Sequence, residues 1–160
     1  MIEFQPHELA VGGGTLAISP MPGRTRHYYT DWLRMEAWRP DAVLSVVPLH
    51  ELERKGAGSL GTDLAGIGVA WLHFPVPDYG VPGDWQAEDW TEISTKVLTV
   101  LSRGGRVLVH CYGGCGRSGM AVLRLMIAAG EVADAALSRL RAVRPCAVET
   151  TAQMDWARRG

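Results

Sequence analysis

The chain has 160 residues, with 16 Lys and Arg, 17 Asp and Glu, and a formal net charge of −1. This near-neutral balance gives no reason to expect nucleic acid or an anionic membrane as a partner. A hydrophobic fraction of 47% and a charged fraction of 21% are ordinary for a soluble globular chain, and the length predicts one domain, 1–160. No apolar run approaches the ~20 residues that a membrane span requires.

The apolar pattern predicts strands that alternate with helices along the chain. Short apolar runs predict strands at 15–19, 42–47, 69–74 and 106–109. Helical spacing and breakers predict helices at 30–38, 49–55, 59–65, 89–103, 120–129, 132–143 and 151–158. Thr30 or Asp31 is the expected cap of the first helix, and prolines and glycines make 75–83 a loop. The fold class is therefore α/β, with a central, mostly parallel sheet flanked by helices.

One glycine-rich stretch, residues 110–119, joins the strand at 106–109 to the long apolar helix. Its sequence is His-Cys-Tyr-Gly-Gly-Cys-Gly-Arg-Ser-Gly. Glycines allow the backbone N–H groups of such a loop to approach an oxyanion closely, and the following helix start adds positive dipole character. Arg117 adds a planar fork suited to phosphate, and Cys111 beside these positive groups should be a thiolate at neutral pH. The stretch predicts a nucleophile within an anion-binding site, which is the arrangement of a phosphate-cleaving centre.

At these residues the sequence resembles the cysteine-dependent phosphatases, whose hallmark is His-Cys, five residues, then Arg and Ser or Thr. The resemblance implies catalytic roles for Cys111 and Arg117. It also implies phosphate binding by the loop residues Tyr112, Gly113, Gly114, Cys115, Gly116 and Arg117. The alternative is a buried structural cysteine on a glycine turn.

A second stretch, residues 73–82, resembles the general-acid loop of dual-specificity phosphatases. It reads His-Phe-Pro-Val-Pro-Asp-Tyr-Gly-Val-Pro. The closest pattern is that of the cyclin-dependent-kinase-inhibitor-associated phosphatase group, His-His-Pro-x-x-Asp-Gly-Gly-x-Pro, from which Phe74 and Tyr79 depart. The resemblance implies that Asp78 is the general acid. The alternative role for Asp78 is to stabilise the turn, and the rival candidate for the acid is Asp84.

The same resemblance suggests supporting roles for other residues. Ser118 would donate a hydrogen bond to the Cys111 sulfur, although a serine here could also cap the helix. His110 would hold the loop, and Gln153 would position the hydrolytic water or lie on a plain surface helix. Cys115 is either a small loop filler or an oxidative partner of Cys111. The basic residues Arg24, Arg26 and His27 form a solvated loop or contact substrate.

The function that these features predict is hydrolysis of phosphate monoesters in proteins, on phosphotyrosine and on phosphoserine or phosphothreonine. Phosphorylated protein or peptide and phosphate-like oxyanions are the expected ligands, without cofactor or metal, because Arg117 and amides supply the electrophile. A rhodanese-like sulfurtransferase and a catalytically silent phosphate-binding module are the alternatives. Residues 1–8 lack the features of a signal peptide, and three cysteines do not indicate a disulfide framework. We therefore expect a reducing, cytoplasmic location.

Overall fold

The computed structural model describes residues 4–160, which form an α/β fold around a five-stranded sheet. The strand order is β1-β2-β5-β3-β4, with only β1 antiparallel to its neighbour, so the mostly parallel sheet is confirmed. Residues 1–3, part of the segment in which we expect no signal peptide, lie outside the described residues. The strands are β1 (His7–Val11), β2 (Gly14–Ser19), β3 (Ala42–Ser45), β4 (Ala70–His73) and β5 (Arg106–His110).

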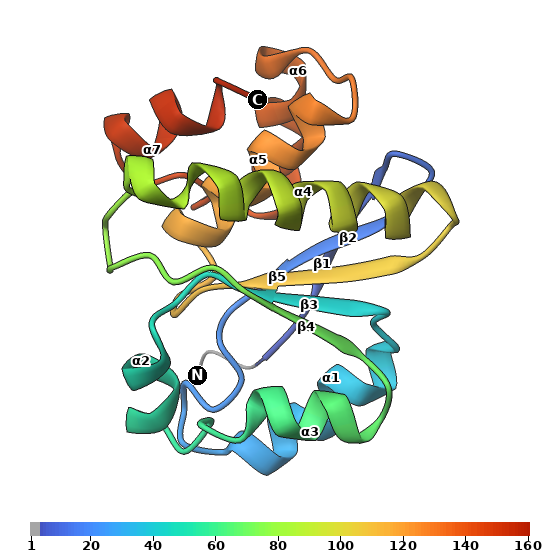
Figure 1. Ribbon diagram of the computed structural model, residues 1–160, viewed down its shortest axis with the longest axis vertical. Coiled ribbons are helices and arrows are strands. Elements are labelled where there is room, and N and C mark those ends of the chain that lie inside the picture. The colour runs from blue at the N-terminus through green and yellow to red at the C-terminus, as the bar shows by residue number, and fades with distance from the viewer. Residues whose placement is uncertain (1–3) are drawn as a thin grey trace.

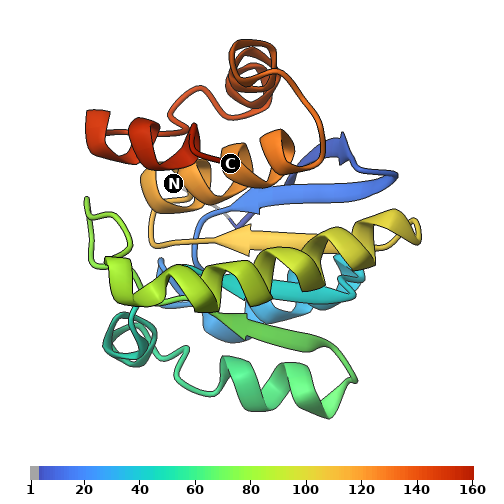
Figure 2. The same ribbon diagram turned by 45° about the horizontal axis from the view of Figure 1, so that its top comes forward.

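Helices cover both faces of the sheet (Figure 1). One layer contains α4 (Ala87–Ser102), α5 (Gly116–Ala128), α6 (Ala133–Val143) and α7 (Thr151–Ala157), and a short 3-10 turn, η1 (Asp84–Gln86), precedes it. The other layer contains α1 (Tyr28–Trp38), α2 (Leu49–Arg54) and α3 (Leu60–Gly66). Figure 2 shows the sheet between the two layers, with α4 running along it. All of the predicted helices and strands are present, with bounds that differ by a few residues.

The central strand β5 shows why a continuous apolar run suits this position. Val107 and Val109 belong to the core under α4 and α5, whereas Leu108 belongs to the core on the opposite face. Successive strand side chains point to opposite faces, so a strand that helices cover on both sides needs apolar residues at every position. The two cores therefore follow directly from the period-two geometry of the strands.

Two features of the N-terminal region differ from the predictions. Strand β1 was not predicted; it pairs with β2 through a turn at Gly12 and Gly13, both with positive φ. Helix α1 begins at Tyr28, so the prediction that Thr30 or Asp31 caps it is wrong. Asp31 is buried instead and accepts a hydrogen bond of 2.8 Å from the Gly23 amide. This bond anchors the segment between β2 and α1 across its turn.

The carboxyl ends of β2, β3 and β5 meet at one edge of the sheet. His110, the last residue of β5, lies in register with Ser19 on one side and with Ser45 on the other. Ligands of α/β sheets bind at such an edge, beyond the ends of the parallel strands. Within residues 4–160, none of the helices combines the length and the apolar character that crossing a membrane would require.

Candidate active site

The loop after β5 is held against the end of β2. The Met21 amide donates a 3.0 Å hydrogen bond to the Tyr112 carbonyl. Gly114 has a φ of +72°, and a Cβ at this position would lie 2.6 Å from the Pro20 nitrogen. Only glycine satisfies both the backbone conformation and the close approach, which explains the residue type here. The loop then enters α5 at Gly116, so its amides surround the N-terminal end of that helix.

Cys111 is buried at the start of this loop, with 2% of its surface exposed. Its sulfur lies 3.1 Å from the Ser118 hydroxyl. Ser118 lies within α5, whose N-cap is Cys115, so the alternative that Ser118 caps the helix is wrong. The Ser118 hydroxyl is thus free of a capping role and lies next to the sulfur.

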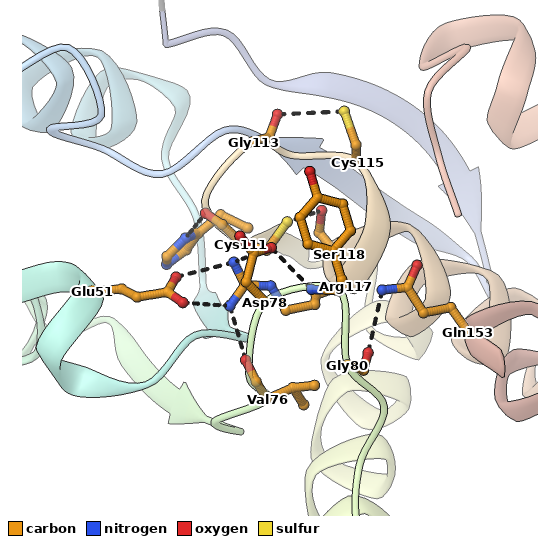
Figure 3. A network of polar contacts seen from close by, with 12 residues as sticks. Glu51, Val76, Asp78, Gly80, Cys111, Gly113, Cys115, Arg117, Ser118 and Gln153 are labelled. Atoms are coloured by element: carbon orange, nitrogen blue, oxygen red, sulfur yellow. Dashed lines mark hydrogen bonds and ion pairs between the residues drawn. The ribbon is translucent and has the colours of Figure 1, made fainter. Parts of the chain in front are cut away.

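Arg117 is the charged group at the base of the site, and 2% of its surface is exposed. Its two terminal nitrogens donate 3.0 Å hydrogen bonds to the two carboxylate oxygens of Glu51, and Nη1 also donates to the Val76 carbonyl at 2.8 Å. Figure 3 shows this convergence of segments that are distant in sequence. A guanidinium has five N–H groups, so Nε–H and one Nη2–H remain for a bidentate oxyanion.

Asp78 lies beside Arg117, next to the cysteine loop (Figure 3). Its Oδ1 is 3.4 Å from Arg117 Nη2, and its side chain is 58% exposed. Oδ1 also accepts a 3.0 Å hydrogen bond from the Tyr79 amide, so part of the turn-stabilising role is present as well. Asp84 lines a different cavity with Arg124 and Trp156. The geometry therefore favours Asp78 over Asp84 as the acid.

His110 is fully buried and forms the end of a polar chain. The Trp71 indole N–H donates to the Ser45 hydroxyl at 2.8 Å, the hydroxyl contacts His110 Nε2, and His110 Nδ1 bonds the Cys111 carbonyl at 3.0 Å. A neutral ring that donates from Nδ1 and accepts at Nε2 satisfies every group. Burial lowers the pKa of His110 to about 4. The hydrogen bond to the Cys111 carbonyl raises this pKa, and the charges of Arg117 and His73 lower it. His110 therefore holds the loop as a neutral ring.

Gln153 is fully buried at the start of α7, so the alternative of a plain surface residue is wrong. Its amide oxygen accepts from the backbone N–H groups of Glu149 and Thr150, at 3.0 and 3.2 Å. Its amide nitrogen donates to the Gly80 carbonyl at 3.2 Å, two residues beyond Asp78. Gln153 thus connects the cap of α7 to the loop that carries Asp78, as Figure 3 shows.

The cysteines differ from the sequence predictions. Cys115 forms a disulfide with Cys146, 31 residues away, and Cys111 is a free thiol. Cys115 is therefore neither a simple loop filler nor a partner of Cys111, and the three cysteines, which did not indicate a disulfide framework, include one disulfide. The reason is spatial: the segment after α6 passes over the loop, and the two Cα atoms lie 5.1 Å apart.

Arg144 reinforces the same contact. Its Nε donates to the Gly114 carbonyl at 2.9 Å and its Nη2 to the Gly113 carbonyl at 2.8 Å. Neither Arg144 nor Glu51 was identified from the sequence. Glu51 is 66 residues from Arg117, and only the fold reveals that pairing. No local spacing in the sequence marks either residue.

Comparisons with known proteins agree with this geometry. Residues 23–131, 109 of the 160, match the family Tc-R-P, described as "Polymorphic toxin system, DSP-PTPase phosphatase". The chain is 34% identical over 91 residues to cyclin-dependent kinase inhibitor 3 of Mus musculus, covering 56% of this chain and 42% of that protein. It is also 34% identical to the mouse protein tyrosine phosphatase domain-containing protein 1, over 54% of this chain and 11% of the relative. The chain thus spans less than half the length of these curated relatives.

Two solved structures share the fold. The structure of Tk-PTP in the active form is 32% identical, with a TM-score of 0.73 over 96% of this chain and 95% of that one. Kinase-associated phosphatase, solved with serine in place of its catalytic-site cysteine, aligns with a TM-score of 0.84 over 96% and 92% of the chains. At 21% identity, that second likeness concerns the fold. The family match covers more than half of the chain and includes Asp78 and the whole cysteine loop, so the chain belongs to the DSP-PTPase phosphatase family of polymorphic toxin systems.

Proposed function

We propose that residues 1–160 form one phosphatase domain that hydrolyses phosphate monoesters of proteins or peptides through a phosphocysteine on Cys111. The substrates are phosphotyrosine and, through the same loop, phosphoserine or phosphothreonine. The observation that carries the proposal is the meeting of a free buried thiol with the Ser118 hydroxyl at 3.1 Å and the Arg117 fork at the start of α5. A nucleophile and an anion cradle occupy one small volume.

In the first step the Cys111 thiolate attacks phosphorus, and the bond from phosphorus to the leaving oxygen breaks. The loop amides and the two remaining N–H groups of Arg117 hold the non-bridging oxygens as negative charge shifts in the transition state. The leaving oxygen takes both electrons of the broken bond and a proton from Asp78. A phosphate on Arg117 would lie next to the Asp78 carboxyl, because that carboxyl is itself 3.4 Å from Nη2.

In the second step a water molecule attacks the phosphorus of the phosphocysteine and gives up a proton to the Asp78 carboxylate. The sulfur leaves as a thiolate, to which Ser118 donates its hydroxyl hydrogen. Gln153 supports this step by fixing the backbone at Gly80, near Asp78. One of its amide N–H groups has no bond within the protein among those described, and it remains the candidate group for orienting the water.

Membership of a phosphatase family supports phosphorylated proteins as the substrates. Phosphate-like oxyanions should occupy the loop, whereas a net charge of −1 gives no basis for nucleic-acid or membrane partners. A reducing, cytoplasmic location would keep Cys111 as a thiol. The Cys115–Cys146 bond bears on that location, and alkylation of fresh cell extract followed by mass spectrometry measures its state. Cys115 and Cys146 found as thiols would support a reducing compartment, and an intact disulfide would contradict it.

The direct experiment is hydrolysis of an activated aryl phosphate by the wild-type chain and by Cys111→Ser, with and without a chelator. We expect the wild type to turn over the substrate with or without the chelator. We expect no turnover by Cys111→Ser, because a serine hydroxyl stays protonated at neutral pH. Substantial turnover by Cys111→Ser would refute the covalent mechanism. Activity in a cyanide–thiosulfate assay would indicate a sulfurtransferase instead. Inactivity of the wild type in both assays would indicate a silent phosphate-binding module.

A further inference from the structure

The side chain of Tyr112, the residue after the nucleophile, lies close to two cations from separate segments. The Arg24 guanidinium carbon is 5.1 Å from the centre of the Tyr112 ring, and the Lys55 ammonium is 5.7 Å from it. Arg24 belongs to the segment between β2 and α1, and Lys55 follows α2. All three side chains are half-buried. An aromatic face within about 6 Å attracts a cation and thus restricts where each charge can lie.

Within residues 4–160, neither Arg24 nor Lys55 has a carboxylate partner at ion-pair distance. The nearby Glu51 carboxylate is already used by Arg117. The charge of Arg24 also acts on Arg144: burial lowers the pKa of Arg144, the charge of Arg24 lowers it further, and Cys111 opposes the shift. Like charges repel one another, so an incoming anion would relieve the repulsion between Arg24 and Arg144.

These cations line two cavities that share Asp78 and Tyr112. One cavity, of about 350 Å³, includes Arg24 and Arg144; the other, also about 350 Å³, includes Lys55 and Arg54. Each cavity also has two carboxylates: Asp78 and Glu149 line the first, and Asp78 and Glu51 line the second. Because Asp78 would lie at the leaving oxygen, whatever continues from the phosphorylated residue would enter one or both of these cavities. There, in the part of the chain that the structure describes, Arg24 and Lys55 have no carboxylate at ion-pair distance.

We propose that Arg24, Tyr112 and Lys55 form a substrate subsite that recognises acidic side chains on either side of the phosphorylated residue of a protein substrate. This inference rests on the proposed phosphatase function. A peptide leaves its reacting residue in two directions, which matches two cavities that share Asp78 and Tyr112. Exposed Tyr79, with 65% of its surface accessible, adds an aromatic rim to the first cavity for the peptide to contact. The reacting phosphate itself uses the loop amides and Arg117, so these cations remain for its neighbours.

The test compares kcat/KM for three phosphotyrosine peptides of equal length, with acidic, neutral amide or basic flanking residues. For the wild type we expect the acidic peptide to exceed the neutral one by about tenfold, mainly through KM, and the ratio to fall as salt is added. Arg24→Gln and Lys55→Gln should each reduce that ratio several-fold, and the double variant should abolish it. Arg24→Lys and Lys55→Arg keep the charge and should retain most of the preference.

Arg26→Gln is the matched control, because it removes the same charge from the same segment at a side chain that lines neither cavity. It should keep the wild-type ratio. An equal kcat/KM for acidic and neutral peptides in the wild type, or an unchanged ratio in the double variant, would overturn the subsite. If the double variant lost turnover on a short-chain phosphatidylinositol phosphate but not on peptides, the cations would be assigned to a lipid headgroup. That result would also overturn the peptide subsite. Absence of wild-type turnover on any aryl phosphate would instead refute the proposed function.

Discussion

At the scale of single residues, the site depends on the fixed orientation of one guanidinium. Arg117 contacts a carboxylate and a carbonyl that lie 66 and 41 residues away, so its fork is oriented before any substrate binds. Preorganised donors do not have to reorient during the reaction, which is why such groups stabilise transition states strongly. Bidentate pairing with Glu51 also offsets the cost of burying the Arg117 charge.

Arg117→Lys tests this orientation. Lysine keeps the charge but cannot present planar pairs of N–H groups both to Glu51 and to two phosphate oxygens. We expect kcat/KM for an aryl phosphate to fall by at least about 100-fold, in the range seen when one preorganised donor is lost. Arg124→Lys, the same change further along α5, is the control and should remain within a few-fold of wild type. Near-normal activity of Arg117→Lys would show that charge alone suffices.

His110 makes stability depend on pH. Its pKa is about 4 in the folded chain against an ordinary 6.5, so the unfolded chain binds the extra proton between these values and stability rises with pH there. The contribution of neutral His110 to the free energy of unfolding is complete above pH 6.5. It falls by up to about 3 kcal/mol as the pH is lowered towards 4. His110→Gln removes this component. Urea unfolding at pH 7.5 and 5.0 should therefore show a smaller acid loss in the variant than in the wild type, and equal losses would contradict the account.

At the scale of elements, two segments without regular structure determine the chemistry: residues 75–83 and the stretch after α6. Arg117 and Gln153 fix the first segment by donating to its Val76 and Gly80 carbonyls. Arg144 and Cys146 fix the second segment to the cysteine loop. Loops at the carboxyl edge of a parallel sheet are free to vary because the strands and helices already supply the core.

The Asp78 loop leads to a comparison of leaving groups. If Asp78 protonates the leaving oxygen, Asp78→Asn should lower kcat/KM for a phosphotyrosine peptide within the ~10²–10⁴-fold range of general acid catalysis. An activated aryl phosphate, whose phenolate leaves without help, should be affected less. Asp84→Asn is the matched control, because Asp84 lines a separate cavity. A steeper leaving-group dependence in Asp84→Asn than in Asp78→Asn would assign the acid to Asp84.

The disulfide between the cysteine loop and the segment after α6 should stabilise the fold. It closes a loop of 31 residues, for which the chain-entropy estimate is about 3 to 4 kcal/mol. Cys146→Ser, and reduction of the wild type, should lower the free energy of unfolding by up to this amount. Because Arg144 still holds the Gly113 and Gly114 carbonyls, activity of the folded protein should persist. A wild type whose unfolding is unchanged by reductant would contradict this role.

The sequence predicted elements well where the pattern is local, and site partners poorly where they are distant. Strands such as β5 and the glycine loop have distinctive local patterns, and both were predicted. Strand β1 was missed although Gly12 and Gly13, between two strand-length segments, are a hairpin signal. Glu51 and the pairing of Cys115 with Cys146 depend on contacts across the fold, and no period or motif in the sequence encodes them.

At the scale of the whole molecule, the active site joins the two helical layers. Arg117 belongs to α5 on one face of the sheet, and Glu51 belongs to α2 on the other, so their pair crosses the sheet edge beside the cysteine loop (Figures 1 and 3). The anion site exists only when both layers and the strands between them are folded. A ligand that binds only the folded chain must therefore stabilise the molecule as a whole.

Phosphate or vanadate should accordingly raise the free energy of unfolding, by about 2.7 kcal/mol at a concentration 100 times Kd. Cys111→Ser should show nearly the same shift, because the loop amides and Arg117 remain, whereas Arg117→Lys should show much less. Thermal unfolding at increasing phosphate, with chloride at matched ionic strength as the control, measures all three proteins. An equal rise in stability with chloride would mean that general screening of charges, rather than binding of phosphate, causes the effect. A shift in the wild type that is absent from Cys111→Ser would mean that the sulfur, rather than the amides and Arg117, binds the anion.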